Sequence, residues 1–307
     1  MTTSPYRPAL TALSAVGAVG VAAAVWGIGI ERHLYAVRRS TIAVLAPGST
    51  PLRVLHLSDA HMAPWQHRKQ SWIAALAGLC PDLIVNTGDN LGHVDGLRGI
   101  QSAFEAFEGI PGVFVHGSND VAAPSPRNPL LYFGGPSKKR VTEEHLDTDS
   151  LDRFMGDTLG WSDLNNAATS LEVNGQRINA FGVSDAHRGW DDLEALPGLL
   201  SGLGRSTLTL GVTHAPYRRV LDTFTGLGAD IIFGGHTHGG QVRVPGFGAL
   251  VANCDIPLKQ ASGLSSWTGG GRTIPLNVSA GLGHSIYAPV RFACRPEASL
   301  LTLVARA

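Results

Sequence analysis

Two histidines stand one residue apart in a glycine-rich run, and their type and spacing are the first indication of chemistry. His236 and His238 belong to the stretch Gly-Gly-His-Thr-His-Gly-Gly-Gln, residues 234–241. Glycine adds little packing and costs chain entropy, so such a run marks backbone that bends sharply or comes close to a ligand. Neutral imidazole is a frequent metal ligand. Taken alone, the run is equally compatible with a polar turn.

The apolar segment 230–235 leads into these histidines, and four other segments typical of buried strands end in residues of the same kind. They are segments 52–57, 82–88, 112–116 and 208–213. They lead, in that order, into Asp59 and His61, Asp89 and Asn90, Asn119 and Asp120, and His214. Loops at the carboxyl ends of strands form the ligand crevice of α/β sheets, so we expect these side chains to converge. A hydrophobic core does not explain five polar strand ends.

The donor types predict a metal centre. Imidazoles and hard oxygens without a thiolate suit Mn²⁺, iron, Zn²⁺ or a mixed pair, and they argue against a cysteine zinc site. The cysteines are Cys80, Cys254 and Cys294, which are too widely separated for a disulfide framework and suit a reducing environment. Six or seven ligands exceed what one ion needs if a position stays open for substrate. The pattern therefore predicts two divalent ions that share a bridging carboxylate.

The order of the motifs resembles the calcineurin-like metallophosphoesterase family, whose pattern runs D-x-H, G-D-x, G-N-H-[DE], an isolated H, and G-H-x-H. The corresponding stretches here are Asp-Ala-His at 59–61, Gly-Asp-Asn at 88–90, Gly-Ser-Asn-Asp at 117–120, Thr-His-Ala-Pro at 213–216 and Gly-His-Thr-His at 235–238. Segments 235–245 and 289–303 look like a membrane-associated bacterial branch of that family. The resemblance covers about residues 51–304. It implies an α/β fold, a layered α-β-β-α sandwich of two packed β-sheets flanked by helices.

The resemblance also implies a role for each matched residue. Asp59, His61 and His238 would bind the first metal, and Asp89 would bridge both ions. The second metal would be completed by Asn119, His214 and His236. The residues predicted to act in catalysis are Asp59, Asp89, Asn119 and His238, and those predicted to bind substrate are Asn90, Asp120 and His284.

The stretch Gly-Ser-Asn-Asp departs from the family pattern. Aligned without a gap, Ser118 falls on the ligand Asn and Asn119 on the general-acid His. Serine is a poor metal ligand, so we expect Asn119 to supply its amide oxygen through a local adjustment. Alternatively, Ser118 stays near the metal through a water. The acid histidine is missing either way, and His116 and His284 are candidates for its role, each with a structural role as the alternative.

The predicted reaction is hydrolysis of a phosphomonoester or phosphodiester. Two cations would acidify a shared water, hold the bridging hydroxide in line with phosphorus and neutralise charge on the phosphoryl oxygens. An alternative is a metal-containing scaffold that binds a phosphorylated partner with weak or no turnover. A nuclease is disfavoured, and no nucleic-acid partner is expected, because the 24 basic and 24 acidic residues give zero net charge and no basic–aromatic stripe is present.

The elements between these motifs alternate between strand and helix patterns, as in a layered α/β core. Helices are expected over 67–80, 95–109, 146–158, 190–202 and 216–226. Further strands are expected over 169–173, 177–183, 230–234, 249–252, 274–279 and 299–304. We expect residues 32–50 to be a linker and residues 51–307 to be the metallophosphoesterase domain. The loop 123–140 carries Arg127, Lys138, Lys139 and Arg140, which could meet anionic headgroups or lie on a solvated surface.

The N-terminal part, residues 1–31, reads as a tail and a transmembrane helix. Residues 9–30 contain no charge and are long enough to span about 30 Å of hydrocarbon. A signal peptide cleaved after Ala-Ala-Ala at 22–24 is the alternative. Arg7 precedes the run, whereas Arg32, Arg38 and Arg39 follow it, so the positive-inside bias predicts a single-pass protein of the cell membrane with a cytoplasmic domain. A membrane position makes lipid-linked or nucleotide phosphates plausible substrates; the oligomeric state is left open.

Overall fold

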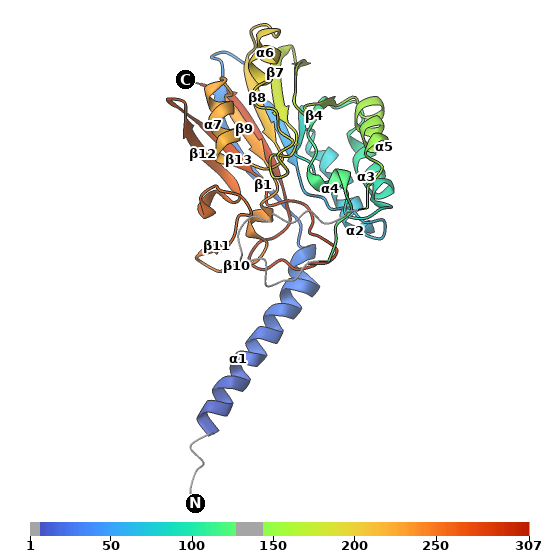
Figure 1. Ribbon diagram of the computed structural model, residues 1–307, viewed down its shortest axis with the longest axis vertical. Coiled ribbons are helices and arrows are strands. Elements are labelled where there is room, and N and C mark those ends of the chain that lie inside the picture. The colour runs from blue at the N-terminus through green and yellow to red at the C-terminus, as the bar shows by residue number, and fades with distance from the viewer. Residues whose placement is uncertain (1–6, 127–143, 307) are drawn as a thin grey trace, which may run out of the picture.

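Two six-stranded mixed sheets form the centre of the fold in the computed structural model, which describes residues 7–126 and 144–306 (Figure 1). The first sheet has the strand order β1-β14-β2-β3-β4-β5. β14 runs antiparallel to β2 and parallel to β1, and β2 to β5 are mutually parallel. The bounds are β1 (Ala36–Leu45), β2 (Leu52–Leu57), β3 (Leu83–Asn86), β4 (Gly112–Phe114), β5 (Ser162–Asp163) and β14 (Glu297–Ala305).

The second sheet has the strand order β12-β13-β9-β8-β7-β6. Its four central strands are parallel, and β12 and β6 are antiparallel edges. The bounds are β6 (Ala167–Val173), β7 (Gln176–Val183), β8 (Leu208–Thr213), β9 (Ile231–Gly234), β12 (Gly263–Gly269) and β13 (Arg272–Val278). A small antiparallel pair, β10 (Arg243–Val244) and β11 (Gly248–Ala249), follows the glycine-rich run. The strand predicted over 249–252 is therefore wrong beyond Ala249.

Helices cover both outer faces. The first sheet is covered by α2 (His67–Ala74), η3 (Ala75–Leu79), α3 (Gly96–Phe104), η4 (Glu105–Phe107), α5 (Thr148–Arg153) and η6 (Phe154–Thr158), and the second by α6 (Leu196–Ser201) and α7 (Arg218–Gly226). Short turns complete the fold: α4 (Ser118–Val121), η7 (His238–Gly240) and η8 (Leu258–Gln260). The predicted α-β-β-α sandwich is confirmed.

Burial of both faces of the central strands explains why these strands are mainly apolar. Leu83 and Val85 of β3 face the layer between the sheets, whereas Ile84 faces the layer under the helices. Both faces of a strand between two such layers are buried, so most of its residues are apolar until the strand ends. The first polar residues after each buried strand therefore lie at the carboxyl edge of a sheet.

The segment predicted as a linker, 32–50, contains β1, which is a correction to that prediction. β1 pairs in parallel with β14 over its whole length, from Ala36 beside Glu297 to Leu45 beside Ala305. Arg38 also donates to the carboxylate of Glu297 at 2.6 Å. The alternating exposure of β1 is typical of an edge strand, where charged side chains face solvent. The chain therefore enters the sheet directly after the N-terminal helix.

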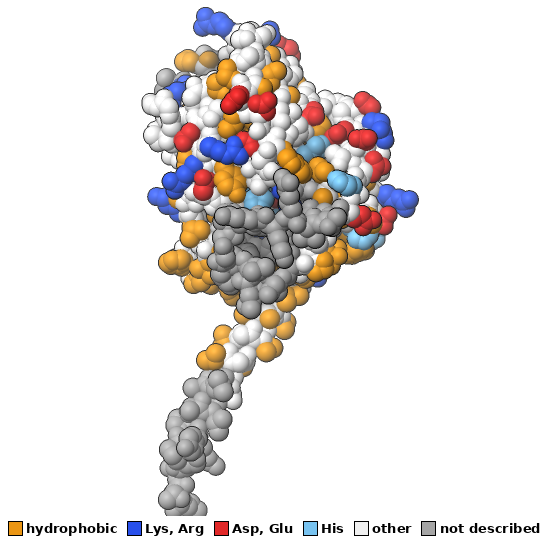
Figure 2. Space-filling view, viewed as in Figure 1, with side chains coloured by type: hydrophobic (Ala, Val, Ile, Leu, Met, Phe, Trp, Pro, Cys, Tyr) orange, Lys and Arg blue, Asp and Glu red, His pale blue; other side chains and the backbone are white. Residues whose placement is uncertain are grey.

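The N-terminal helix α1 (Arg7–Val25) extends away from the domain, at the end where α2, β10 and β11 lie (Figure 1). The stretch Ser14–His33 is long and apolar enough to cross a membrane, a property that a signal sequence shares. Figure 2 shows hydrophobic side chains on its described part, where Val16, Val19 and Val21 are each about two-thirds exposed. α1 continues through η1 (Trp26–Ile30) and η2 (Glu31–His33) into the domain. The basic residues 127 and 138–140 lie outside the described residues.

Glu31 joins the helix to the domain. Its carboxylate, 5% exposed, accepts from Trp26 Nε1 at 2.7 Å, Ala293 N at 3.0 Å and Cys294 N at 2.7 Å. The carbonyl of Gly27 accepts from the backbone N of Arg291 at 3.1 Å. A Cβ at Gly27 would stand 2.9 Å from the Arg291 carbonyl oxygen, so only glycine allows this approach. The helix is therefore held to the domain by polar contacts.

We expect Glu31→Gln to lower the free energy of unfolding by about 2 kcal/mol, because an amide nitrogen would replace an oxygen that accepts buried N–H groups. Thermal unfolding of the full chain in a mild detergent measures the change. Glu172→Gln is the matched control, since Glu172 is exposed on β6 and should melt like the wild type. Equal melting of both variants would refute the role assigned to Glu31.

Candidate metal centre

The loops that carry the predicted ligands have an unusual backbone conformation. Asp59, His61, Asp89, His236 and His238 all have positive φ, between 39° and 66°. Non-glycine residues rarely adopt this region, and the cost is tolerated where surrounding contacts impose it. Here backbone hydrogen bonds do so, for example from Asp59 N to the Gly88 carbonyl at 2.8 Å and from His61 N to the Asp89 carbonyl at 2.9 Å. The first two strand-end loops are thus held together through their backbones.

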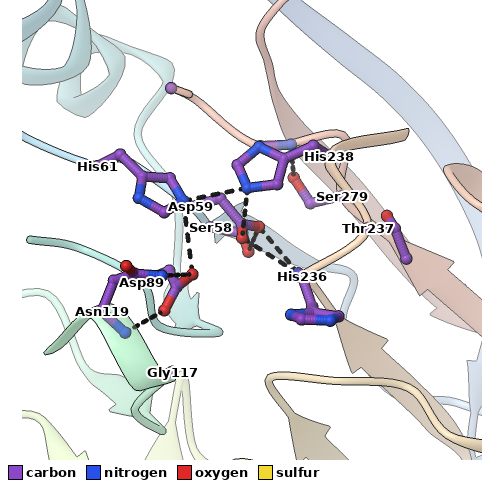
Figure 3. Close-up of polar contacts among 12 residues, drawn as sticks. Ser58, Asp59, His61, Asp89, Gly117, Asn119, His236, Thr237, His238 and Ser279 are labelled. Atoms are coloured by element: carbon purple, nitrogen blue, oxygen red, sulfur yellow. Dashed lines mark hydrogen bonds and ion pairs between the residues drawn. The ribbon is translucent and has the colours of Figure 1, made fainter. Parts of the chain in front are cut away.

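One group of four donors converges at the carboxyl end of β2 (Figure 3). Asp59, His61, Asp89 and His238 each offer a ligand atom, and these atoms all lie within 4.8 Å of one another. The Nε2 atoms of His61 and His238 are 3.0 Å apart. His61 Nε2 is 3.4 Å from Asp89 Oδ2, and His238 Nε2 is 3.5 Å from Asp59 Oδ1. The structure therefore brings together the set predicted for the first metal plus the predicted bridge.

A second group of donors adjoins Asp89 from the other sheet. His214 Nε2 is 3.6 Å from Asp89 Oδ2 and 3.3 Å from His236 Nδ1. His214 Nδ1 donates to the Thr87 carbonyl at 2.7 Å, so Nε2 is the nitrogen that faces Asp89 and His236. His236 Nε2 lies 3.2 Å from the Asn253 carbonyl oxygen and 3.1 Å from the Asn253 side-chain nitrogen, so Nδ1 is the nitrogen that faces His214. Both inward nitrogens are oriented as ligands.

The electrostatics of the two groups favour bound cations. Burial lowers the pKa of His61 to about 4 and that of His236 to about 3, so both rings are neutral and able to coordinate. Burial alone would lower the pKa of His214, but Asp89, Asp185 and Asp59 outweigh it and raise this pKa to about 9. The carboxylates thus create a negative potential at His214, and a negative potential favours bound cations.

The donor set fits two divalent ions. The Nδ1 of His61 is buried without a hydrogen-bond partner among the described residues, and its Nε2 faces another neutral imidazole. Glycines leave room around the carboxylates, because a Cβ at Gly117 would collide with the Asp89 side chain and one at Gly235 would collide with Asp59. Nitrogen and carboxylate oxygen donors without sulfur suit Mn²⁺, iron or Zn²⁺.

The position of Asn119 differs from the prediction in one respect. Its amide nitrogen donates to Asp89 Oδ2 at 2.7 Å, and its backbone N donates to Asp89 Oδ1 at 2.9 Å. The side chain thus reaches the bridging carboxylate, but with nitrogen where a ligand oxygen was expected. A half-turn of the amide exchanges the two atoms. Ser118, the other candidate, is 7% exposed, and its backbone N donates to Asp185 Oδ2 at 3.1 Å.

Asn90 and Asp120, which were predicted to bind substrate, have structural partners. Both are fully buried. The Asp120 carboxylate accepts from the backbone N of Asp89 at 2.7 Å, Asn90 at 2.7 Å and Leu91 at 3.1 Å. The Asn90 side chain exchanges hydrogen bonds with that of Asn86. These residues therefore stabilise the loop that presents Asp89.

His116 is held by two carboxylates. Its Nε2 is 2.6 Å from Asp152 Oδ1, and its Nδ1 is 3.5 Å from Asp120 Oδ2, an ion-pair distance rather than a hydrogen bond. Burial alone would lower the pKa of His116, but the two carboxylates outweigh it and raise the pKa to about 10. These contacts favour the structural role for His116 over that of an acid at the metal centre.

The raised pKa predicts a pH dependence of stability. A histidine whose pKa is higher in the folded state stabilises the fold fully below its unfolded pKa of about 6.5, and this contribution is lost as pH rises toward 10. His116→Gln should therefore cost about 2 kcal/mol at pH 6 and much less at pH 10. Chemical denaturation at both pH values measures the difference. A deficit that stays constant or grows with pH would contradict the ion pairs.

The tetrapeptide Ser-Asp-Ala-His occurs twice in the chain, and its second copy was not among the predicted site residues. It occupies residues 58–61 after β2 and residues 184–187 after β7. In the second copy, Asp185 accepts from Ser118 N and from His187 N at 2.8 Å. The His187 ring lies 4.4 Å from that of His236, centroid to centroid, and its Nδ1 is 2.9 Å from the Tyr217 hydroxyl. The repeated tetrapeptide at the end of a second strand could have identified Asp185 and His187 from the sequence.

Arg291 is the other residue that sequence analysis missed. It is fully buried and donates to the carbonyls of His238 at 3.1 Å and Ala280 at 2.7 Å. One guanidinium nitrogen lies 3.3 Å from His238 Nδ1. Arg291 therefore positions the loop of His238, and its backbone contact with Gly27 links that loop to the N-terminal helix.

Comparison with known proteins agrees with this geometry. The sequence profile of the family described as "Calcineurin-like phosphoesterase" matches residues 52–240, the segment that carries every ligand discussed above. Among curated proteins, YkuE of Bacillus subtilis (strain 168), an uncharacterized metallophosphoesterase, is 24% identical over 283 residues, covering 89% of this chain and 87% of YkuE. YpbG of the same organism is 27% identical over 237 residues, covering 76% of this chain and 79% of YpbG.

Among solved structures, TT1561 of Thermus thermophilus aligns with a TM-score of 0.42 and 12% identity, covering 76% of this chain and 90% of TT1561. YfkN from Bacillus subtilis, a calcineurin-like phosphoesterase, aligns with a TM-score of 0.40 and 12% identity, covering 75% of this chain and 81% of that chain.

Proposed function

This chain belongs to the calcineurin-like phosphoesterase family and is a metal-dependent phosphoester hydrolase, and from this premise we propose that it is a membrane-anchored phosphoesterase with two divalent ions around Asp89. Asp59, His61 and His238 would hold one ion, and His214, His236 and Asn119 the other. The ions, Mn²⁺, iron or Zn²⁺, would supply Lewis-acid stabilisation of the phosphoryl oxygens and an acidified water. The substrates would be phosphomonoesters or phosphodiesters, with lipid-linked and nucleotide phosphates as the candidate classes.

One observation carries this proposal: two groups of imidazoles and carboxylates from both sheets meet at the same aspartate. Asp89 Oδ2 lies 3.4 Å from His61 Nε2 and 3.6 Å from His214 Nε2. A buried carboxylate between ligand nitrogens of both groups is the arrangement that a bridging role requires.

Other residues of this chain would position the metal ligands. The carboxylate of Asp120 holds the backbone of the Asp89 loop, and Arg291 holds that of the His238 loop, so the ligands need little rearrangement on binding.

Asn119 occupies the place of the family's acid histidine. We assign the contact with the leaving oxygen to His187, which lies beside His236 and retains a half-buried surface. When the Tyr217 hydroxyl donates to Nδ1, the ring's proton is on Nε2, which then serves as the hydrogen-bond donor.

The position at a membrane is part of the proposal. Its support is the exposed apolar helix, its length, and the contacts of Glu31 and Gly27 that hold its end to the domain. The arginines that follow the helix favour a cytoplasmic domain under the positive-inside bias. In this arrangement the metal centre would stay at a fixed distance from the lipid headgroups.

The activity is tested with the full chain purified in a mild detergent, stripped with a chelator and reloaded with Mn²⁺. Hydrolysis of bis(para-nitrophenyl) phosphate and para-nitrophenyl phosphate should vanish on stripping and return on reloading. His236→Ala should lose activity by about 10²-fold or more, because it removes one ligand. His145→Ala changes an exposed histidine and should retain it. A His236→Ala variant at wild-type rate would refute the assignment.

A metal-containing binding scaffold remains the second candidate, because Asn119 replaces the acid histidine and presents nitrogen to Asp89. The same experiment separates the two functions. A scaffold would retain its metals but hydrolyse neither ester above the rate of the free ion.

A further inference from the structure

A cavity of about 300 Å³ opens where the N-terminal helix enters the domain. Its floor is formed by Lys69 and His284, which are 2% and 5% exposed. Arg32 and Tyr35, directly after the helix, form one wall. Residues of the segment 65–68 form the rim. The cavity therefore joins the end of the helix to the loop that follows the first metal-ligand motif.

The charge in this cavity is positive and unbalanced. Arg32, Arg68 and Lys69 line it, and no Asp or Glu does. Within residues 7–126 and 144–306, none of these three forms an ion pair, and Arg32 Nε is buried without a hydrogen-bond partner. The nearest acid along the chain, Glu31, directs its carboxylate to Trp26 and to backbone N–H groups. Lys69 is buried, Arg32 is half-buried and Arg68 is exposed. Three cations gathered around a cavity with no acid in its lining attract an anion, so an anion is the ligand that these side chains fit.

The donors suit a phosphate group. Guanidinium groups bind phosphate oxygens in paired hydrogen bonds, and an ammonium adds a point charge. Lys69 Nζ already donates to the Ala60 carbonyl at 2.5 Å and the His61 carbonyl at 3.3 Å, which fixes it at the floor of the cavity. His284 Nδ1 donates to the Ser285 carbonyl at 3.0 Å, so the ring is oriented as well. Two side chains that line the cavity, Lys69 and His284, are therefore held in place by the fold.

The surroundings suit a phosphate that belongs to a lipid. Arg32 lies at the end of the apolar stretch Ser14–His33. Trp65, on the rim, is 57% exposed, and Trp26 of the helix is 43% exposed. Tryptophan and tyrosine beside arginine at the end of an apolar helix are typical of residues at the level of lipid headgroups. A soluble phosphate would need none of these exposed aromatic side chains.

We propose that this cavity binds the phosphate of an anionic phospholipid headgroup, through Arg32, Arg68 and Lys69. The inference rests on the proposed membrane anchoring, and it adds to the phosphoesterase a lipid site that touches the backbone of the His61 loop. A bound headgroup would fix the domain against the bilayer surface.

The test uses the full chain in nanodiscs that contain equal amounts of phosphatidylcholine and phosphatidylglycerol. Native mass spectrometry of the released protein counts the lipids that stay bound. The wild type should retain phosphatidylglycerol in preference. Arg32→Gln with Arg68→Gln should reduce this preference about tenfold, since each arginine contributes attraction to an anionic lipid. Arg68→Gln alone, at an exposed residue that cannot disturb the fold, should reduce it by less.

Arg39→Gln is the matched control, because Arg39 carries the same charge on the exposed side of β1, outside the cavity. It should keep the wild-type preference. No preference in the wild type, or an unchanged preference in the double variant, would overturn the site. Loss of phosphatidylglycerol on adding millimolar inorganic phosphate would show that the cavity takes free phosphate, which overturns the lipid assignment.

The measurement does not depend on hydrolysis. Lipid retention without phosphoesterase activity would reject the proposed reaction and keep the lipid site. Activity without lipid preference would reject the lipid site and keep the reaction. Failure of the chain to enter nanodiscs would overturn the membrane anchoring itself.

Discussion

Replacing Asp89 by Asn is expected to lower kcat/KM for aryl phosphodiesters by about 10³-fold, the largest loss among the substitutions considered. The carboxylate contacts both donor groups, at 3.4 Å from His61 Nε2 and 3.6 Å from His214 Nε2. The amide removes the charge that would hold both cations and keeps the shape of the side chain. Saturation kinetics with Mn²⁺ in excess measure the loss.

Asp157→Asn is the control for this substitution, because Asp157 is exposed in η6 and should leave kcat/KM unchanged. Circular dichroism of both variants shows whether the fold is kept. If folded Asp89→Asn protein turned over the diester within a few-fold of the wild type, the bridging role would be wrong.

Replacing His187 by Asn should have the second-largest effect, and the effect should depend on the leaving group. We expect turnover of alkyl phosphate esters to fall about 10²-fold, because a poor leaving oxygen needs a hydrogen-bond donor. Esters of para-nitrophenol should be hydrolysed at nearly the wild-type rate, because this anion leaves unaided. The Asn side chain leaves the metal ligands and the backbone contact with Asp185 in place. Rates across a series of leaving groups measure the change.

His93→Asn is the matched substitution, since His93 lies at a different surface and pairs with Asp95. Its rates should follow those of the wild type across the series. A His187→Asn variant that slows all esters equally would indicate a structural effect, and one that slows none would exclude contact with the leaving group. A parallel loss with Tyr217→Phe would support the pairing of the two side chains.

Most elements that carry the site could be predicted from sequence, because a strand buried on both faces reads as a mainly apolar run. β2, β3, β8 and β9 are of this kind, and their ends place the polar residues. β1 was missed because an edge strand shows one face to solvent, and Arg38 and Arg39 made it resemble a linker. β12, with its serines and glycines, was missed for the same reason.

The roles of site residues that could not be predicted from the sequence have a different cause. Side chains next to a glycine or in an ordered motif, such as His236, could be predicted from local sequence alone. Asp120 has the residue type of a substrate contact, and only the structure reveals that its oxygens accept from the backbone of the Asp89 loop. Arg291 is distant in sequence from every motif, and its burial beside His238 depends on the tertiary fold. Partners separated by many residues are not encoded in any local pattern.

Metal stoichiometry of the full chain is the measurement closest to the central claim, that side chains from both sheets enclose a pair of cations. Elemental analysis of protein reloaded with Mn²⁺ and passed over a desalting column should find about two ions per chain, falling to one or fewer in Asp89→Asn. A wild-type chain that retains no tightly bound ion, or variant and wild type with the same content, would contradict the account.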